Sequence, residues 1–147
     1  MAKREHIFLS GPVKYESDGG HGWRDSVYRY ASDCDWYLRV FDPTEYFDYS
    51  WSDDFQVSDK QIREYYFQAI KGATVVLVNL EGTNRSIGTG MEIQYAVDHD
   101  VPVIGFGLNN IYPWIKDSCT VTFDDLDTAL DYITAYYDFD YRGEEDI

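Results

Sequence analysis

The 147-residue chain carries 27 acidic and 12 basic side chains, for a formal net charge of -15 at pH 7. So acidic a surface excludes the wrapping of a nucleic-acid polymer, because contacts to phosphates need basic side chains. Hydrophobic residues make up 44% of the sequence, which predicts one domain with a buried core, and no apolar stretch reaches membrane-spanning length.

The chain begins with a short apolar strand, predicted for residues 6–10, and no signal-peptide pattern precedes it. We therefore expect a cytoplasmic protein. A polar, glycine-bearing loop follows, then an amphipathic helix at 23–33 and a second strand at 37–41. The next stretch, 45–57, is rich in aromatic and acidic side chains. Its rings could cover a base or pack on a neighbour, and surface cover is the commoner role.

The remaining elements alternate in the same way. Ser58 and Gln61 form a capping-box pattern at the start of a helix that continues to Ile70. Further segments are predicted as strands at 73–78, 101–106 and 120–123, and as helices after residue 90, around 112–115 and beyond a cap at Asp124 or Asp125. Residues 1–137 are therefore predicted as a single domain, followed by an acidic, frayed tail at 138–147.

The order of these segments predicts the fold class. Strands that alternate with helices are typical of an α/β protein, with a mostly parallel five-stranded sheet and helices on both faces. Parallel strands buried on both faces read as continuous apolar runs, as residues 75–78 and 101–106 do. Ligands of such open sheets bind at the carboxyl ends of the strands.

The stretch from Asn79 to Ala96 is the clearest candidate site. A buried strand leads into a loop rich in Gly, Ser, Thr and Asn and then into a helix, so backbone N–H groups gather where phosphate or carboxylate can bind. Glu92 is predicted on the first turn of this helix. Its carboxylate could act as a nucleophile or base. It could also merely complement the helix dipole, and the local pattern alone favours that role.

Metal and dinucleotide chemistry have no support in the sequence. The two cysteines and three histidines are scattered and lack the spacing of metal ligands. The glycines form neither a dinucleotide fingerprint nor a Walker loop. We therefore expect no metal and no cofactor.

Considered together, these motifs resemble the nucleoside 2-deoxyribosyltransferase family, including its deoxynucleoside monophosphate N-hydrolase branch. The most specific match is the pattern S-x-G-T-x-M-E-I-x-Y-A at residues 86–96. The other matching stretches are 7–12, 23–24, 41–43, 78–80, 102–104, 114–115 and 126–133. The resemblance implies a flavodoxin-like fold, assembly as a homodimer or homotetramer, and no cofactor.

The resemblance also implies an activity, the cleavage of the N-glycosidic bond of a 2'-deoxynucleoside or deoxynucleotide. Glu92 would attack C1' of the deoxyribose, and a second nucleobase or water would release the resulting ester. A general acid would stand near the leaving base. The implied substrate is a small molecule, and neither a nucleic-acid polymer nor a membrane is implied as a partner.

Binding positions carry over from the family onto several residues. Ser86 and Gly88 match the positions that hold the 5'-phosphate in the nucleotide branch. The segment from Asn110 to Trp114 matches a region that reaches into the site of a neighbouring subunit. The implied ligand contacts are Phe8, Ser10, Gly11, Asn79, Ser86, Gly88, Thr89, Tyr112 and Trp114.

Three positions depart from the family's pattern. Thr74 stands where an acidic residue usually begins the central strand, Tyr66 replaces a common Asp of the preceding helix, and Phe8 replaces a Tyr that bonds the nucleophile. Side chains that could supply a proton instead are Tyr65, Tyr66, Asp42 and Glu45. Glu92 and Tyr66 are the predicted catalytic pair. The alternative is a catalytically altered or inactive member of the family that binds a nucleotide or nucleotide-like ligand.

Overall fold

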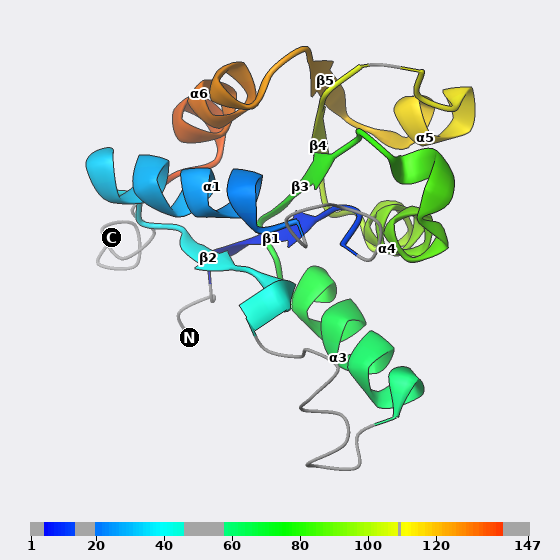
Figure 1. Ribbon diagram of the computed structural model, residues 1–147. Coiled ribbons are helices and arrows are strands. Elements are labelled where there is room, and N and C mark those ends of the chain that lie inside the picture. Colours follow the sequence, from blue (N-terminus) through cyan, green and yellow to red (C-terminus); the bar gives the residue numbers. More distant parts are fainter. Residues whose placement is uncertain (1–4, 14–19, 46–57, 109, 140–147) are drawn as a thin grey trace.

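The computed structural model describes residues 5–13, 20–45, 58–108 and 110–139 (Figure 1). Within these residues, five strands form one parallel sheet in the order β2-β1-β3-β4-β5. The strands are β1 (His6–Ser10), β2 (Arg39–Phe41), β3 (Val75–Asn79), β4 (Val103–Phe106) and β5 (Val121–Phe123). The predicted α/β class with a parallel five-stranded sheet is confirmed.

Helices cover both faces of the sheet (Figure 1). On one face pack α1 (His21–Asp33) and α6 (Leu126–Tyr136), and on the other pack α3 (Asp59–Lys71) and α4 (Ile87–Asp98). The short α5 (Pro113–Ser118) lies beside α4, and two 3-10 turns are η1 (Pro43–Glu45) and η2 (Thr83–Arg85). None of the helices in the described part of the chain has the length and apolar character that a membrane crossing requires.

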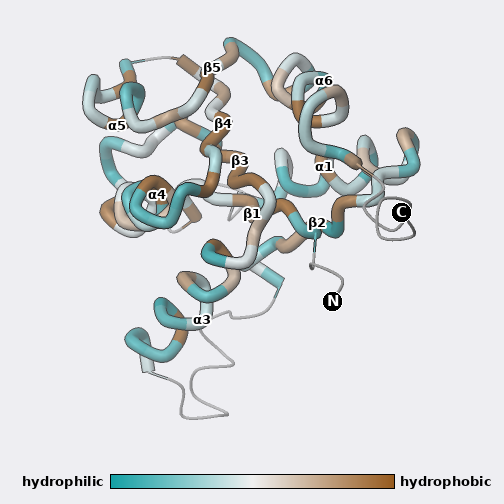
Figure 2. Tube along the Cα trace, turned by 180° about the vertical axis from the view of Figure 1, so that it is seen from behind, coloured by the Kyte–Doolittle hydropathy of each residue, from teal (hydrophilic) through white to brown (hydrophobic). Residues whose placement is uncertain are grey.

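The strands divide their side chains between two cores, because successive residues of a strand point to opposite faces. Ile7 and Leu9 of β1 join the core under α1 and α6, whereas Phe8 joins the core under α3 and α4. Figure 2 shows the apolar character of the central strands running through the middle of the molecule. This burial on both faces explains the continuous apolar runs of the sequence.

Capping side chains set the helix ends. The Oγ of Ser58 accepts a hydrogen bond from the backbone N–H of Gln61 (3.1 Å), and the backbone N–H of Ser58 donates to Oε1 of Gln61 (2.7 Å). The predicted capping box is therefore confirmed, and α3 ends at Gly72. The second of the two candidate aspartates caps α6, since Oδ1 of Asp125 accepts from the N–H of Thr128 at 2.8 Å.

The helix that carries Glu92 begins earlier than predicted. Ser86 is its N-cap and accepts a hydrogen bond from the N–H of Thr89, so α4 starts at Ile87 and includes two glycines. Glu92 therefore lies in the second turn, and its predicted place on the first turn is wrong. The N-cap hydroxyl marks the start of the helix, and the two glycines are accommodated in it despite their low helix propensity.

Two predicted segments lie partly or wholly outside the described residues: most of the aromatic stretch 45–57, and residues 140–147 of the tail. The tail's first residue is held in place. Asp138 Oδ1 accepts hydrogen bonds from the backbone N–H groups of Tyr37 and Leu38, both at 2.9 Å. Asp138 thereby ties the end of α6 to the approach of β2. The division into one domain and a frayed tail stays a prediction.

Candidate functional site

The sheet has a switch point between β1 and β3. The chain leaves the end of β1 toward α1 on one face, and it leaves the end of β3 toward α4 on the other. Connections that diverge in this way leave room at the carboxyl ends of the two strands, where open α/β sheets bind ligands. Ser10 and Asn79, the last residues of these strands, lie at this edge.

Glu92 reaches this edge from α4. Its Oε1 accepts a hydrogen bond of 2.6 Å from Oγ of Ser10, whose side chain is fully buried. Burial raises the pKa of the Glu92 carboxyl to about 7, while the bond from Ser10 and the positive charge of Arg24 act in the opposite direction. A carboxyl group with this pKa changes its charge near neutral pH, so it can serve as a nucleophile, a base or an acid.

Arg24 supplies the positive charge, and it is buried at the first turns of α1. Its Nη1 donates to the carbonyl of Gly20 at 2.8 Å, and its Nη2 donates to the carbonyl of Gly11 at 3.2 Å. Nε lies 3.5 Å from Oδ1 of Asp42, which is equally buried. The guanidinium also lies over the ring of Trp23, 4.6 Å from its centroid.

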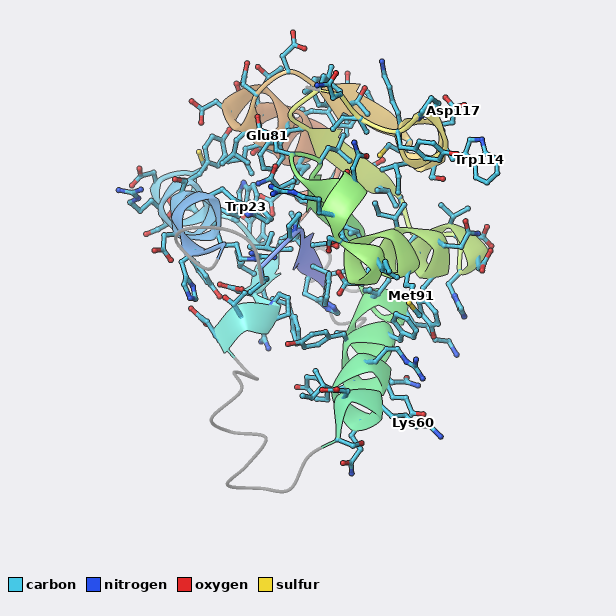
Figure 3. The ribbon with its side chains drawn as sticks, turned by 45° about the vertical axis from the view of Figure 1, so that its right-hand side comes forward. Trp23, Lys60, Glu81, Met91, Trp114 and Asp117 are labelled. Carbon is cyan, nitrogen blue, oxygen red and sulfur yellow. The ribbon has the colours of Figure 1, made fainter. Side chains whose placement is uncertain are left out.

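The floor of the site is tightly packed at Gly11. A Cβ at this position would lie 3.2 Å from both Cβ of Asn79 and Cζ2 of Trp23. Trp23 projects from α1 toward the sheet and makes an edge contact with Phe106 at the end of β4 (Figure 3). Its buried Nε1 has no hydrogen-bond partner among the described residues. The backbone of Gly11, after β1, thus lies against the side chain of Asn79, at the end of β3.

The predicted phosphate residues lie at the start of α4. The hydroxyl groups of Ser86 and Thr89 form a hydrogen bond of 2.7 Å, and Ser86 also caps the helix. Gly88 is exposed, and a Cβ there would meet no atom within 4 Å. Because residues four apart lie on one side of a helix, Gly88 and Glu92 share a face of α4. Open backbone therefore lies one turn before the carboxylate.

Tyr112 and Trp114 lie on the far side of this helix start. Asn84 fixes the segment before α5, because its Nδ2 donates to the carbonyl of Asn110 (2.7 Å) and its Oδ1 accepts from the N–H of Tyr112 (3.3 Å). The two rings contact each other and are both exposed, Trp114 by 75%. Trp114 projects away from the body of the molecule (Figure 3).

Phe8 and Tyr66 lie beneath the site. Phe8 is fully buried, stacked on Phe41 and in edge contact with Tyr66, and its predicted contact with a ligand stays a prediction. It stands two residues before Ser10 on the same face of β1. The hydroxyl that bonds Glu92 thus comes from Ser10. The hydroxyl of Tyr66 donates to the carbonyl of Pro43 at 2.9 Å, near the end of β2.

Thr74, the first of the three departures, lies at the amino edge of the sheet. Its N–H donates to the carbonyl of His6 and its hydroxyl donates to the carboxylate of Glu5, both at the start of β1. Ser10 ends the same strand, so Thr74 belongs to the opposite edge of the sheet from Glu92. The absence of a carboxylate at position 74 leaves the candidate site unaltered.

Sequence reasoning missed Arg24 and Asp42 as parts of the site. Arg24 shares the inward face of α1 with Val27, three residues further on, and a charged residue on an apolar face was the available signal. Asp42 was considered only as a proton donor, but it holds Arg24 and accepts hydrogen bonds from both the N–H and the hydroxyl of Thr44. Within the described residues, no group of side chains could hold a metal ion.

Solved structures of similar shape exist for this chain. A 2-deoxyribosyltransferase from Leishmania mexicana matches with a TM-score of 0.66 and 16% identity, over 90% of this chain and 99% of that one. A 2-deoxyribosyltransferase from Bacillus psychrosaccharolyticus matches with a TM-score of 0.62 and 19% identity, over 92% and 93%. The chain has the fold of these 2-deoxyribosyltransferases.

A conserved protein from Enterococcus faecalis has the same fold, with a TM-score of 0.68 and 14% identity over 88% of this chain and 95% of that one. No protein-family model and no curated protein matches the sequence. The likeness to known proteins is therefore one of fold.

Proposed function

We propose that this protein cleaves the N-glycosidic bond of a 2'-deoxynucleoside or deoxynucleotide, with Glu92 as the nucleophile. The observation that carries the proposal is the partly buried carboxyl of Glu92, which accepts a hydrogen bond from Ser10 at the switch point of a sheet that has the fold of 2-deoxyribosyltransferases. The sequence motif around Glu92 supports the same assignment.

The reaction has two steps. In the first, a carboxylate oxygen of Glu92 bonds to C1' of the deoxyribose while the C1'–N bond breaks, and its electron pair leaves with the base. In the second, a new nucleobase or a water molecule attacks C1', the ester bond breaks, and the carboxylate is restored. Since the nucleophile has a pKa of about 7, it is half ionised at neutral pH. The rate should therefore rise with pH until Glu92 is fully ionised.

The leaving base needs a proton, and we assign its delivery to Tyr66. Its hydroxyl lies near the end of β2, and its ring touches Phe8 just below Ser10. The other candidates fit less well. Asp42 is buried against Arg24 and Thr44, and Glu45 is exposed and accepts a hydrogen bond from Tyr28.

Gly11 and Asn79 would line the sugar site, and Ser86, Gly88 and Thr89 would receive a 5'-phosphate. The exposed backbone of Gly88, with no atom within 4 Å of where a Cβ would be, supports the phosphate assignment. Tyr112 and Trp114 point outward, which supports assembly as a homodimer or homotetramer in which these rings approach the site of a second copy.

The test is release of free base. Wild type and Glu92→Ala are incubated with each deoxynucleoside and each deoxynucleoside monophosphate, with and without a second base, and products are separated by chromatography. We expect release by wild type only, and a mass increase of one deoxyribosyl group on the peptide that contains Glu92. Equal release by both proteins would refute the nucleophile. The phosphate series tests the role of Gly88.

A second function is favoured by one observation. The hydroxyl of Tyr66 already donates to Pro43, so it is less available for proton transfer than a free carboxylic acid. The protein would then hold a nucleotide-like ligand without turning it over. Calorimetry separates the two functions, because binding without base release supports the second one.

A further inference from the structure

Arg24 is a buried cation in a strongly acidic protein, and the proposed mechanism does not use it. Its side chain and that of Asp42 are each only 1% exposed. Burying a guanidinium is costly unless its charge and its donors are matched. Arg24 has such partners in Gly20, Gly11 and Asp42. One of them, Gly11, follows the residue that donates a hydrogen bond to Glu92.

The guanidinium joins the loop after β1 to the start of α1. Nη2 binds the carbonyl of Gly11, the residue that follows Ser10, and Nη1 binds the carbonyl of Gly20, the N-cap of α1. The fit at Gly20 is close. This glycine has a φ of +77°, and a Cβ there would lie 2.4 Å from Nη1 of Arg24. Both its conformation and its contact with Arg24 exclude a larger residue.

A third segment completes the arrangement. Nε of Arg24 faces Oδ1 of Asp42, which follows β2 and is itself held by the N–H and the hydroxyl of Thr44 at 2.9 and 2.6 Å. Arg24 therefore connects the carboxyl ends of β1 and β2 with the N-terminus of α1. Any movement of Gly11 would move Ser10, its neighbour in the chain.

We propose that Arg24 is a positioning residue for Glu92: its guanidinium fixes Gly11, and thereby the Ser10 hydroxyl, against the carboxylate, and its charge favours the ionised form of that carboxylate. Two effects are thus combined in one side chain. Burial disfavours the charged nucleophile, while Arg24 and Ser10 favour it. The effect on rate rests on the proposed function, but the effect on ionisation does not.

Other charges around Glu92 are more distant or exposed. Asp42 is paired with Arg24. The remaining charged side chains of the described elements that pack against α4 are all exposed: Asp59, Lys60, Arg63, Glu64 and Lys71 of α3, Arg85 of η2, and Lys116 and Asp117 of α5, as is Asp98 of α4 itself. Arg24 is the charged residue that acts on the pKa of Glu92.

The test is a carbon-13 NMR titration of the Glu92 carboxyl in the protein without substrate. Its signal is assigned by comparison with Glu92→Gln, and folding of each variant is checked by circular dichroism. Arg24→Gln should move the titration midpoint upward by about one pH unit, because an opposite charge nearby is lost. Arg29→Gln removes an exposed charge from the same helix and should leave the midpoint unchanged.

Two further variants separate charge from geometry. Asp42→Asn keeps both acceptor contacts to Thr44 and leaves the charge of Arg24 in place; because Asp42 is not among the groups that act on the pKa of Glu92, the Glu92 midpoint should stay near that of wild type. Arg24→Lys keeps the charge without the planar fork, so its midpoint should stay near that of wild type. Base release by Arg24→Lys should nevertheless fall about tenfold in kcat across the whole pH range, since Ser10 is no longer fixed.

Coincident midpoints for Arg24→Gln and Arg29→Gln would overturn the proposal. If Arg24→Gln does not fold, the kcat of Arg24→Lys decides the proposal instead. A kcat for Arg24→Lys equal to that of wild type would refute the positioning role. If none of the proteins releases base but the midpoints move as expected, the proposed function fails and the effect of Arg24 on ionisation stands.

Discussion

The two edges of the β1–β3 pair carry the same combination of groups and differ in what surrounds it. At the carboxyl edge, the Ser10 hydroxyl donates to Glu92, and at the amino edge, the Thr74 hydroxyl donates to Glu5. The two hydroxyl–carboxylate pairs lie about five residues apart along β1, which is roughly 16 Å on an extended chain.

The difference lies in the neighbours of each carboxylate. Glu92 comes from a helix, has a buried cation nearby, and follows open backbone at Gly88. Glu5 precedes the strand itself, and its second oxygen is buried without a hydrogen-bond partner among the described residues. A bonded carboxylate alone therefore does not make a site. The position at the switch point and a fixed positive charge distinguish the edge at which we propose the reaction.

The largest expected effect is on stability. Glu92 has a pKa of about 7 in the folded protein, against 4.5 for an unperturbed glutamate, so the folded state keeps its proton more tightly than the unfolded state does. The stabilisation of the folded state by the protonated Glu92 is fully present below pH 4.5 and is lost as the pH rises through 7. Wild type should therefore lose roughly 3 kcal/mol of unfolding free energy between those limits through this group.

Glu92→Gln should lack this loss, so the variant should become the more stable protein by a similar amount near pH 8. Urea unfolding of both proteins near pH 4 and pH 8 measures the difference. A constant difference between the two pH values would contradict the burial of this carboxyl group.

The next effect compares the two hydroxyl groups. Ser10→Ala removes the hydrogen bond to Glu92, which is worth about 1.5 to 3 kcal/mol because the acceptor is charged. Base release should fall by roughly tenfold to a hundredfold, and the pKa of Glu92 should rise. Full activity of Ser10→Ala would remove the hydroxyl from the proposed mechanism.

Thr74→Val is the matched change at the amino edge. It should leave base release unaltered, while it destabilises the protein by about 1 to 3 kcal/mol, since the buried carboxylate of Glu5 loses its donor. Thermal unfolding and the base-release assay are measured on the same sample. A loss of activity without a loss of stability would mean that position 74 does act on the site.

The smallest effect on a single chain is expected at Trp114. Because this ring is 75% exposed, Trp114→Ala should change the unfolding free energy by no more than about 0.5 kcal/mol. The dissociation constant of the oligomer should rise tenfold or more in Trp114→Ala if the ring lies in the contact between copies. Sedimentation over a range of concentrations measures this, and unchanged association would place the contact elsewhere.

Much of the fold could be predicted, because its signals are local. The buried strands are continuous apolar runs, and Ser58 and Asp125 indicate the starts of the helices that they cap. Glu92 could be singled out because its motif sits between a buried strand and a helix. The predicted place of Glu92 on the first turn is wrong, because Ser86 caps α4 and the helix therefore begins before Gly88 and Gly90.

The network around Glu92 could not be predicted in the same way. Arg24 is buried by partners that are 4, 13 and 18 positions away in the chain, Gly20, Gly11 and Asp42, and no local pattern connects them. Thr74 directly precedes the central strand, so the order of the elements already predicts that it lies at the amino edge of the sheet. The hydrogen bond from its N–H to the carbonyl of His6 agrees with this position.

The packing of α1 against α6 has a consequence for how the protein is made. Tyr30 donates to Asp131 and Trp36 to Thr134, across separations of 101 and 98 residues. During synthesis, α1 leaves the ribosome long before α6 exists, so the part of its apolar side that α6 covers stays exposed until this last helix is made. Slow translation of the intervening segment should therefore promote aggregation of the nascent chain, and chaperones that shield helical apolar surfaces should relieve it.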